Sequence, residues 1–203
     1  MKKNAEAVTT FRATFGNRVQ AVIPARTTQA VVVWAMDESR LGLHTIRRRR
    51  ITARGTQPVG TYQHAYSNFY LYGAIAPRTG DAYFLGLPTL NAAHFQRFLD
   101  DFAQAHPHTL NVLLVDNSRA HTAAALQLPP NIKLLFQPPY APELNPAERV
   151  WRALKDALAW RCFTDLAALQ AHVVQVVEAW TAGMLQSLTA YPFIIEALNA
   201  LSL

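Results

Sequence analysis

The sequence predicts an α/β fold, in which a mixed β-sheet (an antiparallel meander followed by parallel strands) is flanked by helices. Two apolar runs, VVVWAM (31–36) and VLLV (112–115), do not alternate with polar residues, so each is typical of a strand covered on both faces. Residues 70–76 and 82–87 are typical of two antiparallel strands around a Gly-containing turn. Segments with helical periodicity lie between and after these strands, as an α/β domain requires.

The first half of the chain is expected to supply the antiparallel part of the sheet. Residues 5–15 carry apolar side chains at helical spacing, and Gly16-Asn17 predicts the end of that helix, followed by a loop over 18–30. Residues 43–51 are expected to form a strand whose arginines face solvent. A helix over 91–106 carries a single apolar stripe, which is typical of a core-facing helix.

The second half is expected to alternate helices with a strand and to end in a helical tail. The expected elements are a short helix over 119–127, a strand over 131–136, a helix ending near residue 160, a helix over 164–180 and a helix after Pro192. We expect three parts: an N-terminal helix and linker (1–30), the main domain (31–182) and a C-terminal helical tail (183–203) that packs on it.

Composition indicates one globular domain with appendages. The chain has 203 residues, 51% of them hydrophobic, which is enough for one substantial core. No apolar run reaches the roughly 18 residues of a membrane span, and a polar stretch follows the N-terminal Met-Lys-Lys, so we expect a cytoplasmic protein. The single cysteine, Cys162, excludes an internal disulfide framework and a cysteine-based zinc site, and its aromatic neighbours predict a buried position.

The charge is basic and unevenly distributed. The net charge is +6 and the pI is about 9.8, and the arginines between residues 31 and 60 face only Asp37 and Glu38 as acids. Such a patch favours a polyanionic partner, most simply DNA, although an ordinary solvated face is the alternative. The candidate DNA-binding residues are Arg40, Arg47, Arg48, Arg49, Arg50 and Arg54.

Both buried strands deliver a carboxylate to the same edge of the expected sheet. Asp37 follows the first run and Asp116 follows the second. A carboxylate at the edge of a core needs a cation or several hydrogen-bond donors, because burying it unpaired costs several kcal/mol. Asp116 alone can be explained as the cap of a following helix. Two strands that end in this way favour a shared site.

A third carboxylate, Glu148, has two interpretations. In the segment NPAE, Asn145 suits the N-cap, Pro146 the first helical position and Glu148 the capping-box position, so Glu148 can simply bond back to the Asn145 amide. Glu148 also shares a helix face with the core-type residue Trp151, so its side chain is directed partly toward the sheet. On this second interpretation, three carboxylates converge on one spot.

Three converging carboxylates repel one another unless a cation lies between them. An all-oxygen site suits two Mg²⁺ or Mn²⁺ ions about 3.5–4 Å apart and disfavours zinc. The chemistry of such a pair is in-line displacement at phosphorus, in which one ion activates the attacking oxygen and the other stabilises the leaving oxygen.

Three ordered segments resemble the DDE transposases of the mariner superfamily, in particular their bacterial insertion-sequence branch. These segments are VVVWAMDESRLGL, LLVDNSRAH and FQPPYAPELNPAERVW. The resemblance implies a ribonuclease-H-like fold, with Asp37, Asp116 and Glu148 as catalytic and metal-binding residues. It also implies an enzyme that hydrolyses DNA at transposon ends and then uses the freed 3′ hydroxyl to attack target DNA, with no covalent enzyme intermediate.

The same resemblance gives neighbouring residues lesser roles. Asn117 and His121, in the DN-x-x-x-H stretch, and Asn145 are expected beside the metal ligands or on the DNA backbone. An ordinary helix-start asparagine and a packed histidine explain them equally well. Glu38 is expected on the opposite face of the strand from Asp37 and is assigned no metal.

The chain also departs from the resembled family, whose complete members carry helix-turn-helix modules before the catalytic domain. About thirty residues precede the first expected strand, too few for such a module. We therefore expect an upstream-encoded helix-turn-helix portion, a truncated copy or a fragment, acting as a dimer or higher oligomer on DNA in the bacterial nucleoid. Two alternatives stay open: a catalytically idle DNA-binding remnant, and a related nuclease that acts on RNA–DNA hybrids or branched DNA.

Overall fold

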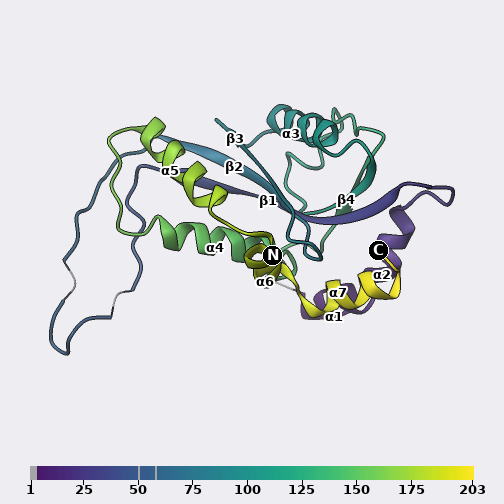
Figure 1. The fold of residues 1–203 in the computed structure, drawn as a ribbon, viewed down its shortest axis with the longest axis horizontal. Helices are drawn as coiled ribbons and strands as arrows, with labels where there is room; N and C mark the ends of the chain where they lie inside the picture. Colours follow the sequence, from purple (N-terminus) through teal and green to yellow (C-terminus); the bar gives the residue numbers. More distant parts are fainter. Residues whose placement is uncertain (1–3, 50, 58) are drawn as a thin grey trace.

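The centre of the molecule is a five-stranded sheet with strand order β3-β2-β1-β4-β5 (Figure 1). The computed structural model describes residues 4–49, 51–57 and 59–203. Its strands are β1 (Ala30–Gly42), β2 (Asn68–Ile75), β3 (Ala82–Leu87), β4 (Thr109–Val115) and β5 (Ile132–Phe136). Strand β2 pairs antiparallel with both β1 and β3, whereas β4 pairs parallel with both β1 and β5. The predicted α/β fold with a mixed sheet is confirmed.

Helices cover both faces of this sheet. They are α1 (Ala5–Ala13), α2 (Phe15–Val22), α3 (Ala92–Ala105), α4 (Ala147–Ala157), α5 (Leu166–Glu178), α6 (Ala182–Thr189) and α7 (Pro192–Ala200), with a short 3-10 turn, η1 (Pro142–Leu144), before α4. Helix α3 covers one face, while α4, α1 and α7 lie on the other side of the sheet (Figure 1). No helix in the described ranges is both long and apolar enough to cross a membrane.

The first strand is longer than expected, and this changes the position of Asp37. Strand β1 pairs with β4 only as far as Ala35 opposite Leu114, but it pairs with β2 from Ala35 to Gly42. The expectation that Asp37 follows the end of its strand is wrong, because the antiparallel partner extends β1 beyond it. Asp37 instead lies inside β1, just past the point where the parallel pairing stops, and Asp116 directly follows β4 as predicted.

Several expected elements are absent or displaced among the described residues. Residues 43–49 and 51 form no strand, because the chain leaves the sheet after β1. Residues 119–127 form turns instead of a helix, since the amides of His121 and Thr122 both bond to the carbonyl of Ser118. Helix α6 is a separate element in the C-terminal segment that was expected to be helical, with only the helix after Pro192 expected by itself. Cys162 is exposed, in the α4–α5 connection, so its expected burial is wrong.

The N-terminal segment is built differently from the expected helix and loop. Helix α2 runs through Gly16-Asn17, so the predicted helix stop is wrong, and it ends only at Val22. At Gly16, a β-carbon would lie 3.5 Å from the side chain of Ala197, at ordinary contact distance, so α2 packs against α7 at this position. Phe11 and Phe15 are fully buried, and the Phe15 ring meets Phe193 edge-on at 5.3 Å. These helices therefore belong to the core on this face.

We expect Phe15→Ala to lower the free energy of unfolding by about 3–5 kcal/mol, because it removes a fully buried aromatic ring and leaves a cavity. Urea denaturation followed by circular dichroism measures this change. Gln20→Ala, at an exposed position of the same helix, is the matched control and should change stability by less than about 0.5 kcal/mol. Equal, small effects of both substitutions would show that α2 is not part of the folding unit.

A long excursion joins β1 to β2, and we call its described residues, 43–49, 51–57 and 59–67, the arm. Figure 1 shows the arm projecting away from the sheet. Its root is fixed by backbone bonds between Leu43 and Ser67 (3.0 Å) and by bonds between Gln63 and both backbone groups of Phe163 (2.9 and 3.1 Å). The arm therefore leaves the body of the molecule at a defined place, between the sheet and the α4–α5 connection.

Candidate active site

Asp37 is held from the α4 side of the sheet. Its Oδ2 accepts a hydrogen bond of 3.0 Å from Nε1 of Trp151, and Trp151 is itself buried on α4. The indole can approach this closely because Gly73 lies opposite Asp37 on β2. A β-carbon at Gly73 would lie 2.6 Å from the Trp151 ring. The sequence analysis missed this arrangement, although a glycine inside a strand is a signal of close approach.

Asn145 fixes the start of α4 next to Asp37. It is buried, and its side-chain amide donates a 2.7 Å hydrogen bond to the carbonyl of Met36, while its side-chain oxygen accepts from the amide of Ala147. One asparagine thus ties the first turn of α4 to β1, at the residue before Asp37. Its burial makes a positioning role more suitable for Asn145 than a contact with DNA.

Glu148 lies in the first turn of α4 and is exposed. The amide of Asn145 donates to the carbonyl of Pro142, and within the described residues the Glu148 carboxylate forms no hydrogen bond to that amide. The capping-box bond is therefore not formed. Because Trp151 lies three residues later and bonds to Asp37, Glu148 is on the side of the helix that approaches the aspartate.

Asp116 is held by a buried histidine that also contacts Glu38. Its Oδ1 accepts a bond of 2.9 Å from the amide of Ser118 and faces Nδ1 of His121 at 2.7 Å. The other ring nitrogen of His121, Nε2, faces Oε1 of Glu38 at 2.9 Å. Since both nitrogens face carboxylate oxygens, the ring donates both bonds as an imidazolium. Glu38 lies on the α3 face of β1, opposite Asp37, and the sequence analysis gave it no part in this contact.

Electrostatics couples these groups. Burial, together with the charges of Glu38, Glu148 and Asp116, raises the pKa of Asp37 from 3.8 to about 8. Burial alone would lower the pKa of His121, but the hydrogen bonds to Asp116 and Glu38 outweigh it and raise that pKa from 6.5 to about 10. The same bond from His121 lowers the pKa of Asp116. A cation beside Asp37 would relieve the repulsion that now favours its protonated form.

Among the described residues, the three predicted acids interact electrostatically but do not gather into a metal site. Glu148 and Asp116 both act electrostatically on Asp37, yet nowhere in the described ranges do three Asp, Glu, His or Cys side chains gather closely enough to hold a metal ion. Both facts follow if like charges stay apart until a cation joins them. The donor set itself, three carboxylates with one under strong repulsion, fits hard divalent ions.

The remaining predicted residues that the structure describes are exposed or bonded to groups other than the three acids. Asn117 is exposed, and its side chain bonds to the carbonyl of Gln137 at the end of β5. Arg48 forms an ion pair with Asp156 of α4, and Arg47 covers the ring of Tyr62. Arg40, Arg49 and Arg54 are exposed. Arg50 lies outside the described residues.

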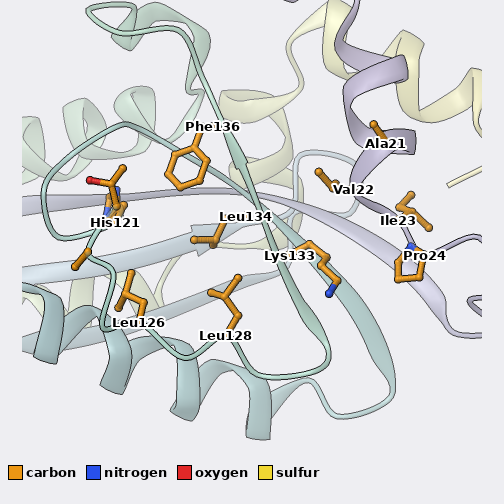
Figure 2. A pocket seen from close by; sticks show the side chains of 12 residues that line it. Ala21, Val22, Ile23, Pro24, His121, Leu126, Leu128, Lys133, Leu134 and Phe136 are labelled. Atoms are coloured by element: carbon orange, nitrogen blue, oxygen red, sulfur yellow. The ribbon is translucent and has the colours of Figure 1, made fainter.

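A mainly aliphatic pocket of about 690 Å³ has His121 among its lining residues (Figure 2). Leu126, Leu128 and Leu134 contribute to its walls, and Lys133 and His121 are its ionisable residues. None of the three predicted acids lines this pocket. It is therefore distinct from the place that Asp37 occupies.

The sequence matches one family model and two bacterial relatives. Residues 32–170 match the family model described as DDE superfamily endonuclease. An uncharacterized protein of Sinorhizobium fredii is 37% identical over 111 residues, which cover 51% of this chain and 78% of that protein. The insertion element IS630 uncharacterized 39 kDa protein of Shigella sonnei is 30% identical over 95 residues, or 44% of this chain and 28% of that protein.

Solved structures of similar fold include the Mos1 mariner paired end complex with Mn. The match has a TM-score of 0.69 at 17% identity and covers 93% of this chain and 60% of that chain. The chain thus spans about 60% of the Mos1 protein and a smaller part of the IS630 protein. The likeness confirms the predicted ribonuclease-H-like fold. The match over residues 32–170 shows that the chain belongs to the DDE superfamily endonuclease family.

Proposed function

We propose that this chain is the catalytic domain of a transposase that cleaves DNA at transposon ends and transfers the freed 3′ hydroxyl into target DNA. The observation that carries the proposal is the state of Asp37 on a DDE-family sheet: burial raises the pKa of its carboxyl, and the charges of Glu38, Glu148 and Asp116 raise it further. A buried carboxylate that other carboxylates repel is unfavourable in a protein with only a structural task. It is suited to a site that binds divalent cations.

In the proposed mechanism, Asp37, Asp116 and Glu148 hold the cations. Two ions of the Mg²⁺ or Mn²⁺ type, when bound, supply activation of the attacking oxygen and stabilisation of the leaving oxygen. Trp151 fixes Oδ2 of Asp37 by its indole N–H, and His121 fixes Oδ1 of Asp116. The second oxygen of Asp116, which has no hydrogen bond within the described residues, is then the one directed to a cation.

The proposed partners are transposon-end DNA and target DNA. Solved Mos1 structures are described as complexes with a left transposon end, with Mn and with Mg, and this supports DNA and divalent ions as ligands of the present chain. An upstream-encoded helix-turn-helix portion, a dimer or higher oligomer on DNA, and association with the bacterial nucleoid complete the proposal. The division into 1–30, 31–182 and 183–203 stays a prediction.

The proposal is tested by incubating the full chain with duplex DNA that carries the terminal repeats of its own element. We expect nicking at the repeat end with Mg²⁺ or Mn²⁺ and none with EDTA, since the carboxylates need the cations to bind the reacting phosphate. Asp116→Ala should remove this activity, measured on a denaturing gel with an end-labelled strand. Activity that survives Asp116→Ala would refute the assignment.

The two alternative functions give different results in the same assay. A catalytically idle remnant binds the DNA, with affinity that falls as salt rises, but produces no metal-dependent nick. A nuclease for RNA–DNA hybrids or branched DNA cuts those substrates in preference to transposon ends and gives no strand-transfer product. Joining of the cleaved end to a second plasmid therefore separates the proposed function from both.

A further inference from the structure

The arm carries a row of exposed aromatic rings at its root. Along residues 61–67, Tyr62, His64 and Tyr66 are exposed, whereas Gln63 and Ala65 between them are partly buried. This alternation is typical of an extended segment. The inward side is anchored because Gln63 bonds to both backbone groups of Phe163. The outward side is left to present its rings to solvent.

The exposed rings form one ordered surface with His44, and we call His44, Tyr62, His64 and Tyr66 the ring ladder. The His44 ring lies 5.2 Å from the rings of both Tyr62 and His64, and the His64 ring lies 4.9 Å from that of Tyr66. Each tyrosine hydroxyl is bonded to Nε2 of a histidine, at 2.8 Å to His44 and 3.1 Å to His64. The rings are thus held in place, although Tyr66 is 72% exposed.

Positive charge lies at both ends of the ring ladder. At the Tyr66 end, a pocket of about 340 Å³ is lined by Arg40 and Lys155, and no acidic residue is among the described residues that line it. At the other end, the Arg47 guanidinium lies 5.1 Å from the centre of the Tyr62 ring. Rigid aromatic rings flanked by cations are the combination that binds single-stranded nucleic acid, with bases on the rings and phosphates on the cations.

We propose that the ring ladder and the Arg40–Lys155 pocket bind a single-stranded segment of DNA, with bases stacked on Tyr66 and its neighbours and a backbone phosphate between Arg40 and Lys155. Duplex DNA hides the faces of its bases in the helical stack, so an exposed tyrosine gains stacking only from unpaired bases. The identification of the ligand as DNA rests on the proposed function, since a strand that is cut at a transposon end can separate from its complement and expose unpaired bases. The binding surface itself requires no catalysis.

The test measures binding of the full-length chain by fluorescence anisotropy in EDTA, so that no cleavage occurs. The probes are a labelled oligothymidine of about 12 nucleotides, within the ~4–16-nucleotide range of known single-strand sites, an abasic strand of equal length and a duplex of equal length. We expect the oligothymidine to bind about 10-fold more tightly than the abasic strand, because both carry the same phosphates and only one carries bases.

Substitutions then separate stacking from charge. Tyr66→Ala should weaken oligothymidine binding about 10-fold and leave abasic binding unchanged, while Tyr66→Phe, which keeps the ring, should retain it. Lys155→Gln should weaken binding of both strands equally and reduce the dependence of log affinity on log salt by about 0.7. Lys133→Gln, on β5, is the matched control for loss of one positive charge. Circular dichroism verifies that each variant is folded.

Equal affinity for the oligothymidine and the abasic strand overturns the proposal. A Tyr66→Ala variant that binds the oligothymidine as tightly as the wild-type chain also overturns the proposal. An effect of Tyr66→Ala that is seen only with duplex DNA overturns it too. Asp116→Ala should bind the oligothymidine normally while failing to nick transposon ends. Failure of the proposed catalytic function is therefore distinguishable from failure of the binding surface.

Discussion

Replacing Glu148 by glutamine is expected to reduce metal-dependent DNA nicking by at least about 100-fold, while the melting temperature of the metal-free protein stays within about 2 °C of the wild type. Glutamine occupies the capping-box position as well as glutamate does, so any helix-capping role is kept. The substitution removes only the charge that a cation needs, and loss of one preorganised electrostatic group costs about 10²–10³ in rate. The paired measurements are gel-based nicking and thermal unfolding.

Glu196→Gln is the matched control for this experiment, because it makes the same chemical change at an exposed position on α7. It should leave both nicking and melting unchanged. If Glu148→Gln nicks DNA at the wild-type rate, Glu148 is not a metal ligand, and its place near Asp37 has no catalytic meaning. If instead the variant melts well below the wild type, the charge of Glu148 stabilises the first turn of α4, and this structural effect is its main role.

Replacing Asp37 by asparagine is expected to stabilise the metal-free protein while abolishing its activity. Above pH 8 the wild-type chain carries a largely buried negative charge that Glu38, Glu148 and Asp116 repel. Asparagine removes that charge and can still accept the hydrogen bond from Trp151. We expect a gain on the order of 2 kcal/mol at pH 8, or about 4–8 °C in melting temperature for a chain of this size.

The stability of the wild-type chain should depend on pH because folding changes the pKa of Asp37. The pKa of Asp37 is 3.8 when unfolded and about 8 when folded, so the folded protein holds a proton that the unfolded chain has lost, and stability falls as pH rises between these values. The Asp37→Asn variant should lack this fall. It keeps the contribution of His121, which is fully present below pH 6.5 and is lost as pH rises through about 10.

Binding of Mg²⁺ is a second test of the repulsion at Asp37, because a cation should stabilise the wild-type chain that carries the charge. A cation that binds only the folded state raises the melting temperature of the wild-type chain and should leave Asp37→Asn nearly unchanged. An Asp37→Asn variant that is less stable than the wild type at pH 8, or a wild-type chain whose stability rises between pH 5 and pH 8, contradicts the repulsion described at this site.

The sequence by itself determined the apolar segments of the five strands and the acid that follows β4, although it also indicated a strand over 43–51 that the described residues do not form. Continuous apolar runs, turn residues and helix-start residues such as Asn91 act over a few neighbouring positions, so they can be recognised without the fold. The N-cap bond of Asn91 and the end of β4 at Val115 lie where this local chemistry places them. The catalytic roles of Asp37, Asp116 and Glu148 stay predictions.

Only the tertiary structure decided how Asp37 and Asp116 are held. The antiparallel partner β2 extends β1 past Asp37, and Gly73 on that partner admits the Trp151 ring. His121 contacts Glu38 across 83 positions of sequence, and the segment that contains it forms turns where a helix was expected. The physical reason is that these contacts depend on which strands become neighbours, and strand order is set by burial over the whole chain and not by any local pattern.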